Sequence, residues 1–211
     1  MEKVLNEISE ALQAGDVNTV QEKIKEALEA GLTPREVLND GLLSGMNIIG
    51  EKFKNNEVFV PEVLIAARAM NGGMEILKPK LIETGVESIG KVIIGTVKGD
   101  LHDIGKNLVK MMMEGAGFDV VDLGTDISPE QFVEAVKEHK PNIVGLSALL
   151  TTTMPQMKET IKALEESGLR NQVFVMIGGA PVTDKYAEEI GADAYSKDAA
   201  SAAAVAKKKV S

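Results

Sequence analysis

The sequence predicts an α/β protein in which a small helical bundle precedes a doubly wound parallel-sheet domain. Two observations lead to this fold class. Apolar residues keep helical spacing up to Gly85, and after that point short β-branched runs alternate with helical segments. We expect one domain over residues 1–88 and a second over residues 89–211. The segment Glu83 to Gly90 separates them and is the expected hinge.

The first domain is expected to contain four or five short helices with brief connections. Its first two helical runs end at Gly15-Asp16 and at Gly31. A third helix is expected to begin at residues 33–36 (TPRE), which provide an N-cap residue, a proline at the first helical position and an acid at the third. Pro61 opens the last helix of this domain.

The second domain is expected to be Rossmann-like or flavodoxin-like, because its strands and helices alternate strictly. The expected strands are residues 91–97, 118–122, 143–147, 173–177 and a short stretch near Ala194. The expected helices are residues 104–115, 129–138, 154–166, 183–190 and the Ala-rich end of the chain. Ligands of such folds bind outside the carboxyl ends of the strands. The candidate site therefore comprises three segments, Gly99 to Gly105, Ser147 to Thr151 and Gly178 to Pro181.

Composition narrows the possible function classes. The chain has 211 residues, no cysteine and a formal net charge of −9. The absence of cysteine excludes disulfides, thiolate metal sites and a cysteine nucleophile. The negative charge opposes binding to nucleic acid. The first residues lack the pattern of a signal peptide, and no apolar run approaches the roughly 20 residues that span a bilayer. We therefore expect a cytoplasmic protein with neither nucleic acid nor membrane as a partner.

One histidine in the first of the three segments has the surroundings of a metal ligand. In an extended loop, side chains two residues apart point to the same side, so Asp100 and His102 are expected to lie together. A carboxylate beside an imidazole fixes its tautomer and raises its basicity toward a metal. Gly105 allows a ligand to approach the next helix closely, and Asp103 is a candidate N-cap of that helix.

The three segments together carry a spaced motif. Asp100-x-His102-x-x-Gly105 is followed, after the 41 positions 106–146, by Ser147-x-Leu149, and after the 28 positions 150–177 by Gly178-Gly179. This set resembles the cobalamin-binding signature of cobalamin-dependent methionine synthase and its relatives. Residues 59–63 (FVPEV), 67–70 (ARAM) and 77–79 (LKP) resemble the helical cap of the same family. The whole chain is similar to the free-standing corrinoid proteins of methyltransferase systems.

The resemblance implies a role for each motif residue. His102 would be the lower axial ligand to the cobalt of a cobalamin or related corrinoid. Asp100 would hydrogen-bond the other ring nitrogen, and Ser147 would extend that relay. Phe59 and Met70 would face the corrin from the cap, unless they belong to the ordinary core of the bundle. The further residues expected to contact the cofactor are Leu101, Asp103, Ile104, Gly105, Leu149, Thr151, Gly178, Gly179, Ala180 and the Tyr195-Ser196 stretch.

The resemblance also implies a function as a methyl carrier. The corrinoid would accept a methyl group on cobalt from a substrate-specific methyltransferase and present it to a second methyltransferase. The second enzyme would use tetrahydrofolate or coenzyme M as the acceptor, and a reductive activase would restore oxidised cobalt. The chain would then be a cofactor-carrying subunit rather than a free-standing enzyme.

Three other interpretations remain open at this point. The same motif occurs in the cobalamin-binding subunit of adenosylcobalamin-dependent mutases, although these do not need a helical cap. A cobalamin-binding sensory module would need a DNA-binding domain, which the net charge of −9 disfavours. A flavodoxin-like domain that binds another ligand, or none, is the third.

Overall fold

The structure is a computed structural model that describes residues 2–84 and 88–210. Contacts divide the chain into two compact units, one made mainly of Met1–Ser88 and the other of Ile89–Glu114 and Phe118–Ser211. We call them the helical unit and the sheet unit. Within the expected hinge, residues 85–87 lie outside the described part of the chain.

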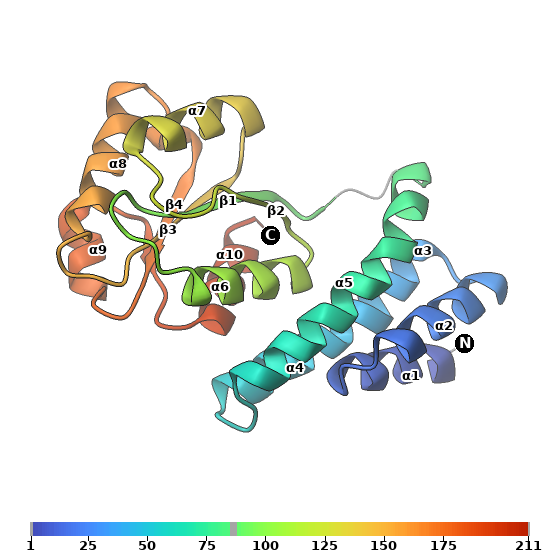
Figure 1. The fold of residues 1–211 in the computed structure, drawn as a ribbon. Coiled ribbons are helices and arrows are strands. Elements are labelled where there is room, and N and C mark those ends of the chain that lie inside the picture. The colour runs from blue at the N-terminus through green and yellow to red at the C-terminus, as the bar shows by residue number, and fades with distance from the viewer. Residues whose placement is uncertain (1, 85–87, 211) are drawn as a thin grey trace. The chain divides into compact units, whose positions relative to one another are not determined.

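The helical unit is the small bundle that the sequence predicts (Figure 1). Asp16 accepts a hydrogen bond from the backbone of Thr19 and so caps the second helix, while Thr33 and Glu36 form the expected capping box. Ile8 and Ile24 are fully buried in its core. The elements of this unit are α1 (Glu2–Gln13), α2 (Val17–Glu29), α3 (Pro34–Glu36), η1 (Val37–Leu43), α4 (Ser44–Lys54) and α5 (Val60–Glu83).

The third expected helix differs from the prediction in one respect. It contains a π-helical segment, η1, between α3 and α4. Gly41 lies in this segment against α1, where an added Cβ would be 3.1 Å from Cγ2 of Ile8. Apolar spacing indicates which face of a helix is buried, but an extra residue in one turn leaves no clear mark on that spacing.

The sheet unit contains a five-stranded parallel sheet with the strand order β2-β1-β3-β4-β5 (Figure 1). This is the doubly wound, flavodoxin-like order, so the predicted fold class is confirmed. Each expected strand is present, with ends that differ by at most one or two residues. The strands are β1 (Lys91–Thr96), β2 (Asp119–Asp122), β3 (Ile143–Ser147), β4 (Phe174–Gly178) and β5 (Ala194–Tyr195).

Helices cover both faces of the sheet (Figure 1). Three of them, α7, α8 and α9, pack on one face around the fully buried Phe132. The other two, α6 and α10, lie on the opposite face. The helices of this unit are α6 (Ile104–Gly115), α7 (Pro129–His139), α8 (Pro155–Glu166), the short 3₁₀ turn η2 (Arg170–Gln172), α9 (Asp184–Ile190) and α10 (Ala199–Val210). Across the described residues, no helix is long and apolar enough to cross a bilayer.

Candidate corrinoid site

The sheet brings the three motif segments together at one edge. Thr96, Ser147 and Gly178 end β1, β3 and β4, and the strand register places Thr96 beside Ser147 and Ser147 beside Gly178. The chain leaves β1 toward β2 on one side and later returns to β3 on the other. The edge between β1 and β3 is therefore the topological switch point, where doubly wound folds bind their ligands.

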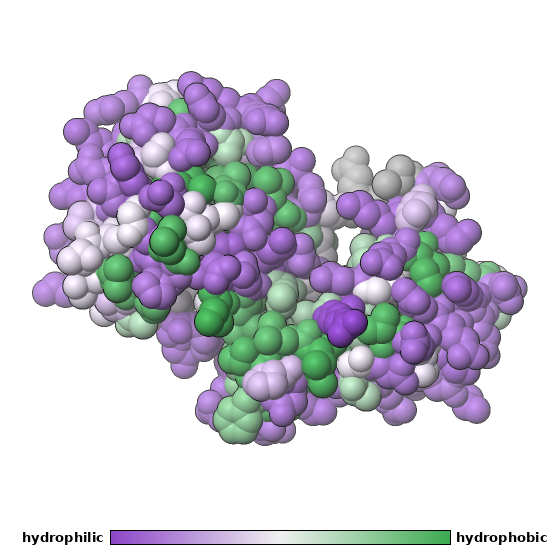
Figure 2. All heavy atoms as spheres, viewed as in Figure 1, coloured by the Kyte–Doolittle hydropathy of each residue, from purple (hydrophilic) through white to green (hydrophobic). Residues whose placement is uncertain are grey.

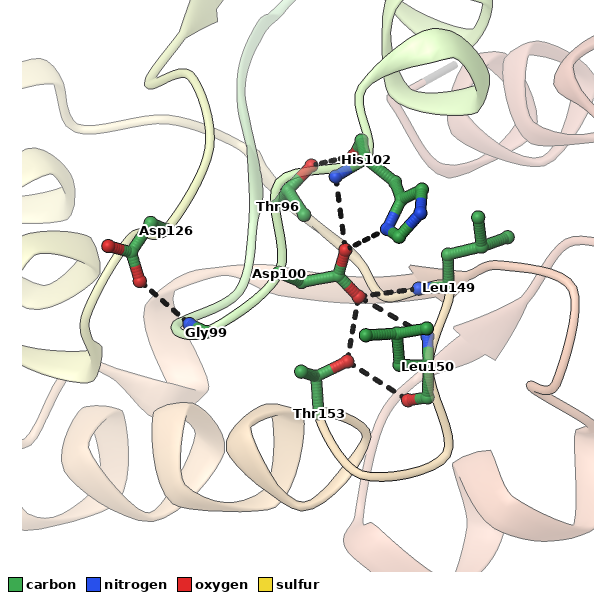
Figure 3. A network of polar contacts seen from close by, with 8 residues as sticks. All are labelled: Thr96, Gly99, Asp100, His102, Asp126, Leu149, Leu150 and Thr153. Carbon is green, nitrogen blue, oxygen red and sulfur yellow. Dashed lines mark hydrogen bonds and ion pairs between the residues drawn. The ribbon is translucent and has the colours of Figure 1, made fainter.

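Asp100 is the centre of a hydrogen-bond network at this edge (Figure 3). Its side chain is fully buried. One carboxylate oxygen lies 2.7 Å from Nδ1 of His102 and accepts the backbone N–H of the same residue at 3.1 Å. The other oxygen accepts the backbone N–H groups of Leu149 and Leu150, at 2.8 and 3.3 Å, and the hydroxyl of Thr153 at 2.7 Å. Asp100 thus joins the loop after β1 to the loop after β3.

The network fixes the charge of Asp100. Burial raises the pKa of its carboxyl, but hydrogen bonds from Thr153, Leu149 and His102 outweigh burial and hold the pKa well below its usual range. The carboxyl is therefore ionised at neutral pH. An ionised carboxylate beside Nδ1 keeps a proton on that nitrogen, which leaves the lone pair of a neutral ring on Nε2.

His102 presents this second nitrogen outward. The side chain is 51% exposed, and Nε2 points away from Asp100 and makes no hydrogen bond with any described residue (Figure 3). The backbone is held as well, because the buried hydroxyl of Thr96 donates a 2.9 Å hydrogen bond to the carbonyl of His102. The ring is therefore held at one nitrogen and free to bind a ligand at the other.

Exposed apolar side chains lie next to His102 in sequence, at the start of α6, and on the loop after β3. Leu101 is 73% and Ile104 is 77% exposed, and Leu149 and Leu150 are each 41% exposed. Figure 2 shows apolar residues among hydrophilic ones on the face in view. Gly105 has open space where a side chain would begin. An apolar surface with an exposed imidazole suits a large cofactor better than a bare ion.

The hydroxyl that bonds to Asp100 in the structure is that of Thr153, whereas the expected relay through Ser147 stays a prediction. The Ser147 hydroxyl makes no hydrogen bond with any described residue, while Thr153 bonds to Asp100. The reason is the path of the loop: Ser147 ends β3, and the following turn brings Thr153, which is only 6% exposed, back to the carboxylate. Thr153 is not predictable from the sequence, because nothing in the run of three threonines distinguishes it from the exposed Thr151.

The remaining motif residues lie at the same edge. Asp103 immediately precedes α6, but its carboxylate accepts a hydrogen bond from the side-chain amide of Asn107. Gly179 has a φ of +138°, and a Cβ there would collide with the carbonyl oxygen of Ala148, so this position requires glycine. The Ser196 hydroxyl, which follows β5, is buried without a partner among the described residues. An orphaned buried hydroxyl of this kind suits a polar ligand group.

Two expected contacts with the corrin lie in the helical unit and differ in burial. Phe59, which precedes α5, is 64% exposed, while Met70 within α5 is 3% exposed. Phe59 is therefore available to a cofactor. Met70 belongs to the core of the bundle, which was the alternative that the sequence left open.

The possible metal-ligating side chains at the site suit a metal ion that is already bound within a cofactor. The described residues contain no group of three or more histidine, cysteine, aspartate or glutamate side chains able to hold a metal ion. His102 would supply one nitrogen to the cobalt of a corrinoid, whose ring would supply the other nitrogen ligands. The residues present therefore fit such a cofactor.

The sheet unit thus belongs to the class of doubly wound α/β domains, and at its ligand-binding edge it presents one carboxylate-held histidine among exposed apolar side chains. The sequence matches two family descriptions, both B12 binding domains, one over residues 90–205 and the other over residues 4–78. The chain belongs to this family of B12-binding proteins, and the expected family resemblance is confirmed.

Curated relatives resemble nearly the whole chain. Trimethylamine corrinoid protein 1 of Methanosarcina acetivorans is 45% identical over 94% of this chain and 93% of its own length. Dimethylamine corrinoid protein 1 of Methanosarcina mazei is 41% identical over 98% of this chain and 95% of its own length.

Two solved structures are similar in fold and sequence. One is the methanol:cobalamin methyltransferase complex of Methanosarcina barkeri, with a TM-score of 0.89, 31% identity, and coverage of 99% of this chain and 80% of that chain. The other is a cobalamin-binding protein of Desulfitobacterium hafniense, with a TM-score of 0.82, 35% identity and coverage of 98% of both chains.

Proposed function

We propose that this chain is a corrinoid methyl carrier in which His102 is the lower axial ligand to cobalt through Nε2. The observation that carries the assignment is the pairing of His102 Nδ1 with buried Asp100 at 2.7 Å while the other ring nitrogen stays exposed. The bound corrinoid supplies a cobalt centre that accepts and releases a methyl group.

In this proposal the chain's own residues orient the His102 ring and fix which of its nitrogens carries the proton. Ionised Asp100 holds the proton of His102 on Nδ1 and so directs the Nε2 lone pair to the metal. The Asp100–His102 pair therefore presents one ring nitrogen, Nε2, to the metal while the other stays bonded to the carboxylate.

Other residues of the edge hold the rest of the cofactor in this proposal. Leu101, Ile104, Leu149 and Leu150 pack against its apolar surface and exclude water. The turn at Gly178-Gly179, the orphaned Ser196 hydroxyl and the other motif residues named above serve its polar tail. Residues 89–211 form the cobalamin-binding domain, and residues 1–88 form the cap, from which Phe59 covers the corrin.

The relatives indicate the kind of partner. Their names assign them to trimethylamine and dimethylamine systems, and a structural relative is a methanol:cobalamin methyltransferase complex. We propose that the methyl donor here is likewise a small methylated amine or alcohol, held by a separate methyltransferase. A second methyltransferase removes the methyl group, a reductive activase restores oxidised cobalt, and these exchanges take place in the cytoplasm. The mutase and sensory alternatives gain no support from these relatives.

Replacing His102 with alanine tests the assignment directly. The cobalamin-reconstituted His102→Ala variant is expected to show the visible spectrum of a corrinoid without a lower imidazole ligand, since one side chain supplies that ligand. The chain contains only two histidines, so His139→Ala is a natural control. His139 lies at the end of α7, 3.9 Å from Glu138, and its removal should leave the spectrum unchanged. An unaltered spectrum in His102→Ala rules the assignment out.

A further inference from the structure

Asp126 is a carboxylate near the site that neither the motif nor the ligand assignment uses. It lies between β2 and α7, and its φ of 58° is left-handed, an unusual backbone conformation for a residue other than glycine. Figure 3 shows its side chain directed at the turn that precedes His102. A strained residue at the edge of a binding site often has a positioning role.

Two hydrogen bonds connect Asp126 to that turn. Its carboxylate accepts the backbone N–H of Gly99 at 2.7 Å, and its own backbone N–H donates to the carbonyl of Asp100 at 3.0 Å. The turn is closed by a 3.1 Å bond from Asp100 N–H to the carbonyl of Val97, and Gly99 has a φ of +79°. Asp126 therefore bonds to the backbone on both sides of the Cα atom of Asp100, which carries the side chain that contacts His102.

The segment that carries Asp126 is itself fixed to the sheet. The carbonyl of Gly124 accepts the N–H of Thr96, and the N–H of Ile127 donates to the carbonyl of Thr96, both at 3.0 Å. Ile127 is only 7% exposed and belongs to the hydrophobic core. Asp126 is thus anchored on both sides, and its left-handed conformation turns the side chain toward Gly99. A left-handed residue other than glycine persists where the surrounding contacts fix its backbone, as they do here.

We propose that Asp126 is a positioning residue that clamps the Val97–Asp100 turn and so sets how firmly His102 reaches a corrinoid cobalt. This inference rests on the proposed function, because it gives Asp126 a role only through His102. It extends the ligand relay from the loops after β1 and β3 to the loop after β2. The loops after β1, β2 and β3 then determine the position of one imidazole.

Two variants separate the effect of the Asp126 side-chain hydrogen bond from the effect of its left-handed backbone conformation. Asp126→Gly removes the carboxylate but accommodates a φ of 58° without cost, so its effect reports the lost side-chain bond. Asp126→Asn keeps an oxygen acceptor in a residue type that tolerates left-handed backbone, so it should rescue the clamp. Asp193→Ala is the matched control, because Asp193 also accepts a backbone N–H at 2.7 Å, from Val175 near the amino end of β4.

The experiment uses the full chain, with and without cobalamin. Without cofactor, exchange of the Gly99 amide, followed by NMR, should be about 10-fold faster in Asp126→Gly and unchanged in Asp193→Ala. With cobalamin, Asp126→Gly should weaken binding about 10-fold and lose part of the imidazole-ligated spectrum, as losing a supporting group around a metal ligand does elsewhere. Asp126→Asn should stay close to wild type in both measurements.

The outcomes distinguish this inference from the proposed function. If His102→Ala alters the spectrum but Asp126→Gly keeps wild-type affinity and spectrum, the clamp has no role in ligation and the inference is wrong. An equal loss of ligation in Asp193→Ala overturns it as well, because general destabilisation would then explain the effect. If His102→Ala leaves the spectrum unchanged, the proposed function fails, and the inference fails with it whatever the Gly99 amide shows.

Discussion

Asp100 accepts five hydrogen bonds from four residues, although it is fully buried. A buried carboxylate without partners would take up a proton, because desolvation disfavours the charged form. Here the donors come from both loops of the switch point, so the charge and the loop arrangement depend on each other. The position of His102 follows from the same contacts.

Asp100→Asn should therefore destabilise the cofactor-free protein by about 3 kcal/mol, since an amide places an N–H₂ group against donors that need an acceptor. The pKa of the Asp100 carboxyl is lower in the folded state than its unperturbed value of 3.8. Its stabilising contribution is then fully present well above pH 3.8 and is lost as the pH falls through the folded-state pKa. Urea unfolding of wild type and Asp100→Asn at pH 7, 4 and 3 should show that the difference between their free energies of unfolding becomes smaller as the pH falls.

Asp119→Asn is the control for this measurement. The Asp119 side chain is half exposed and pairs with Lys91 at 3.4 Å at the opposite end of the sheet, so its loss should cost less than about 1 kcal/mol. A difference between wild type and Asp100→Asn that stays constant down to pH 3 would mean that the charge of Asp100 contributes nothing to stability.

Some contacts of the candidate site could be predicted from the sequence, and others could not. The Asp100–His102 contact was predictable, because two residues of separation in an extended loop put both side chains on one side. Thr153 and Asp126 act across 53 and 27 residues of sequence, and each depends on how a loop returns to the sheet. Neither is marked by spacing or by residue type, so only the folded arrangement identifies them.

At the scale of elements, the sheet unit followed its sequence pattern closely. Strand and helix ends agree within one or two residues because proline, glycine and N-cap residues mark most of them, as Ser128 and Pro129 do at the start of α7. The helical unit was less predictable in detail. Its π segment η1 leaves no clear mark on the apolar spacing, and α5 continues through Pro79, although proline usually disrupts helices.

Met70 in helix α5 and Phe59 just before it offer a test of which residues belong to the core and which to a functional surface. Met70→Ala should destabilise the protein by about 2–4 kcal/mol, because it empties space in a packed core. Phe59→Ala should cost less than about 0.5 kcal/mol, because Phe59 is mostly exposed. If Phe59 covers the corrin as proposed, the bound cobalt of this variant should oxidise faster in air, followed by its visible spectrum. An unchanged oxidation rate would remove Phe59 from the site.

In the molecule as a whole, the two units contribute unequally to the proposed cofactor site. His102, which we propose as the ligand, Asp100 and the loops that hold both belong to the sheet unit. The helical unit contributes an exposed apolar residue and a sequence that matches its own B12-binding description over residues 4–78. Unfolding of such a chain need not be a single two-state event, so each unit has to be observed by itself.

Hydrogen exchange followed by mass spectrometry gives this separation. A ligand that binds only the folded state, at about 100 times its dissociation constant, adds about 2.7 kcal/mol to the unfolding free energy. Cobalamin at that excess should therefore slow the most protected amides of β1, β3 and β4 about 100-fold, and the His102→Ala variant should show much less slowing at the same concentration. Slower amide exchange within residues 2–84 then measures how much the helical unit contributes to binding the cofactor. Stronger slowing there than in the sheet would show that the main binding energy lies outside the loops around His102.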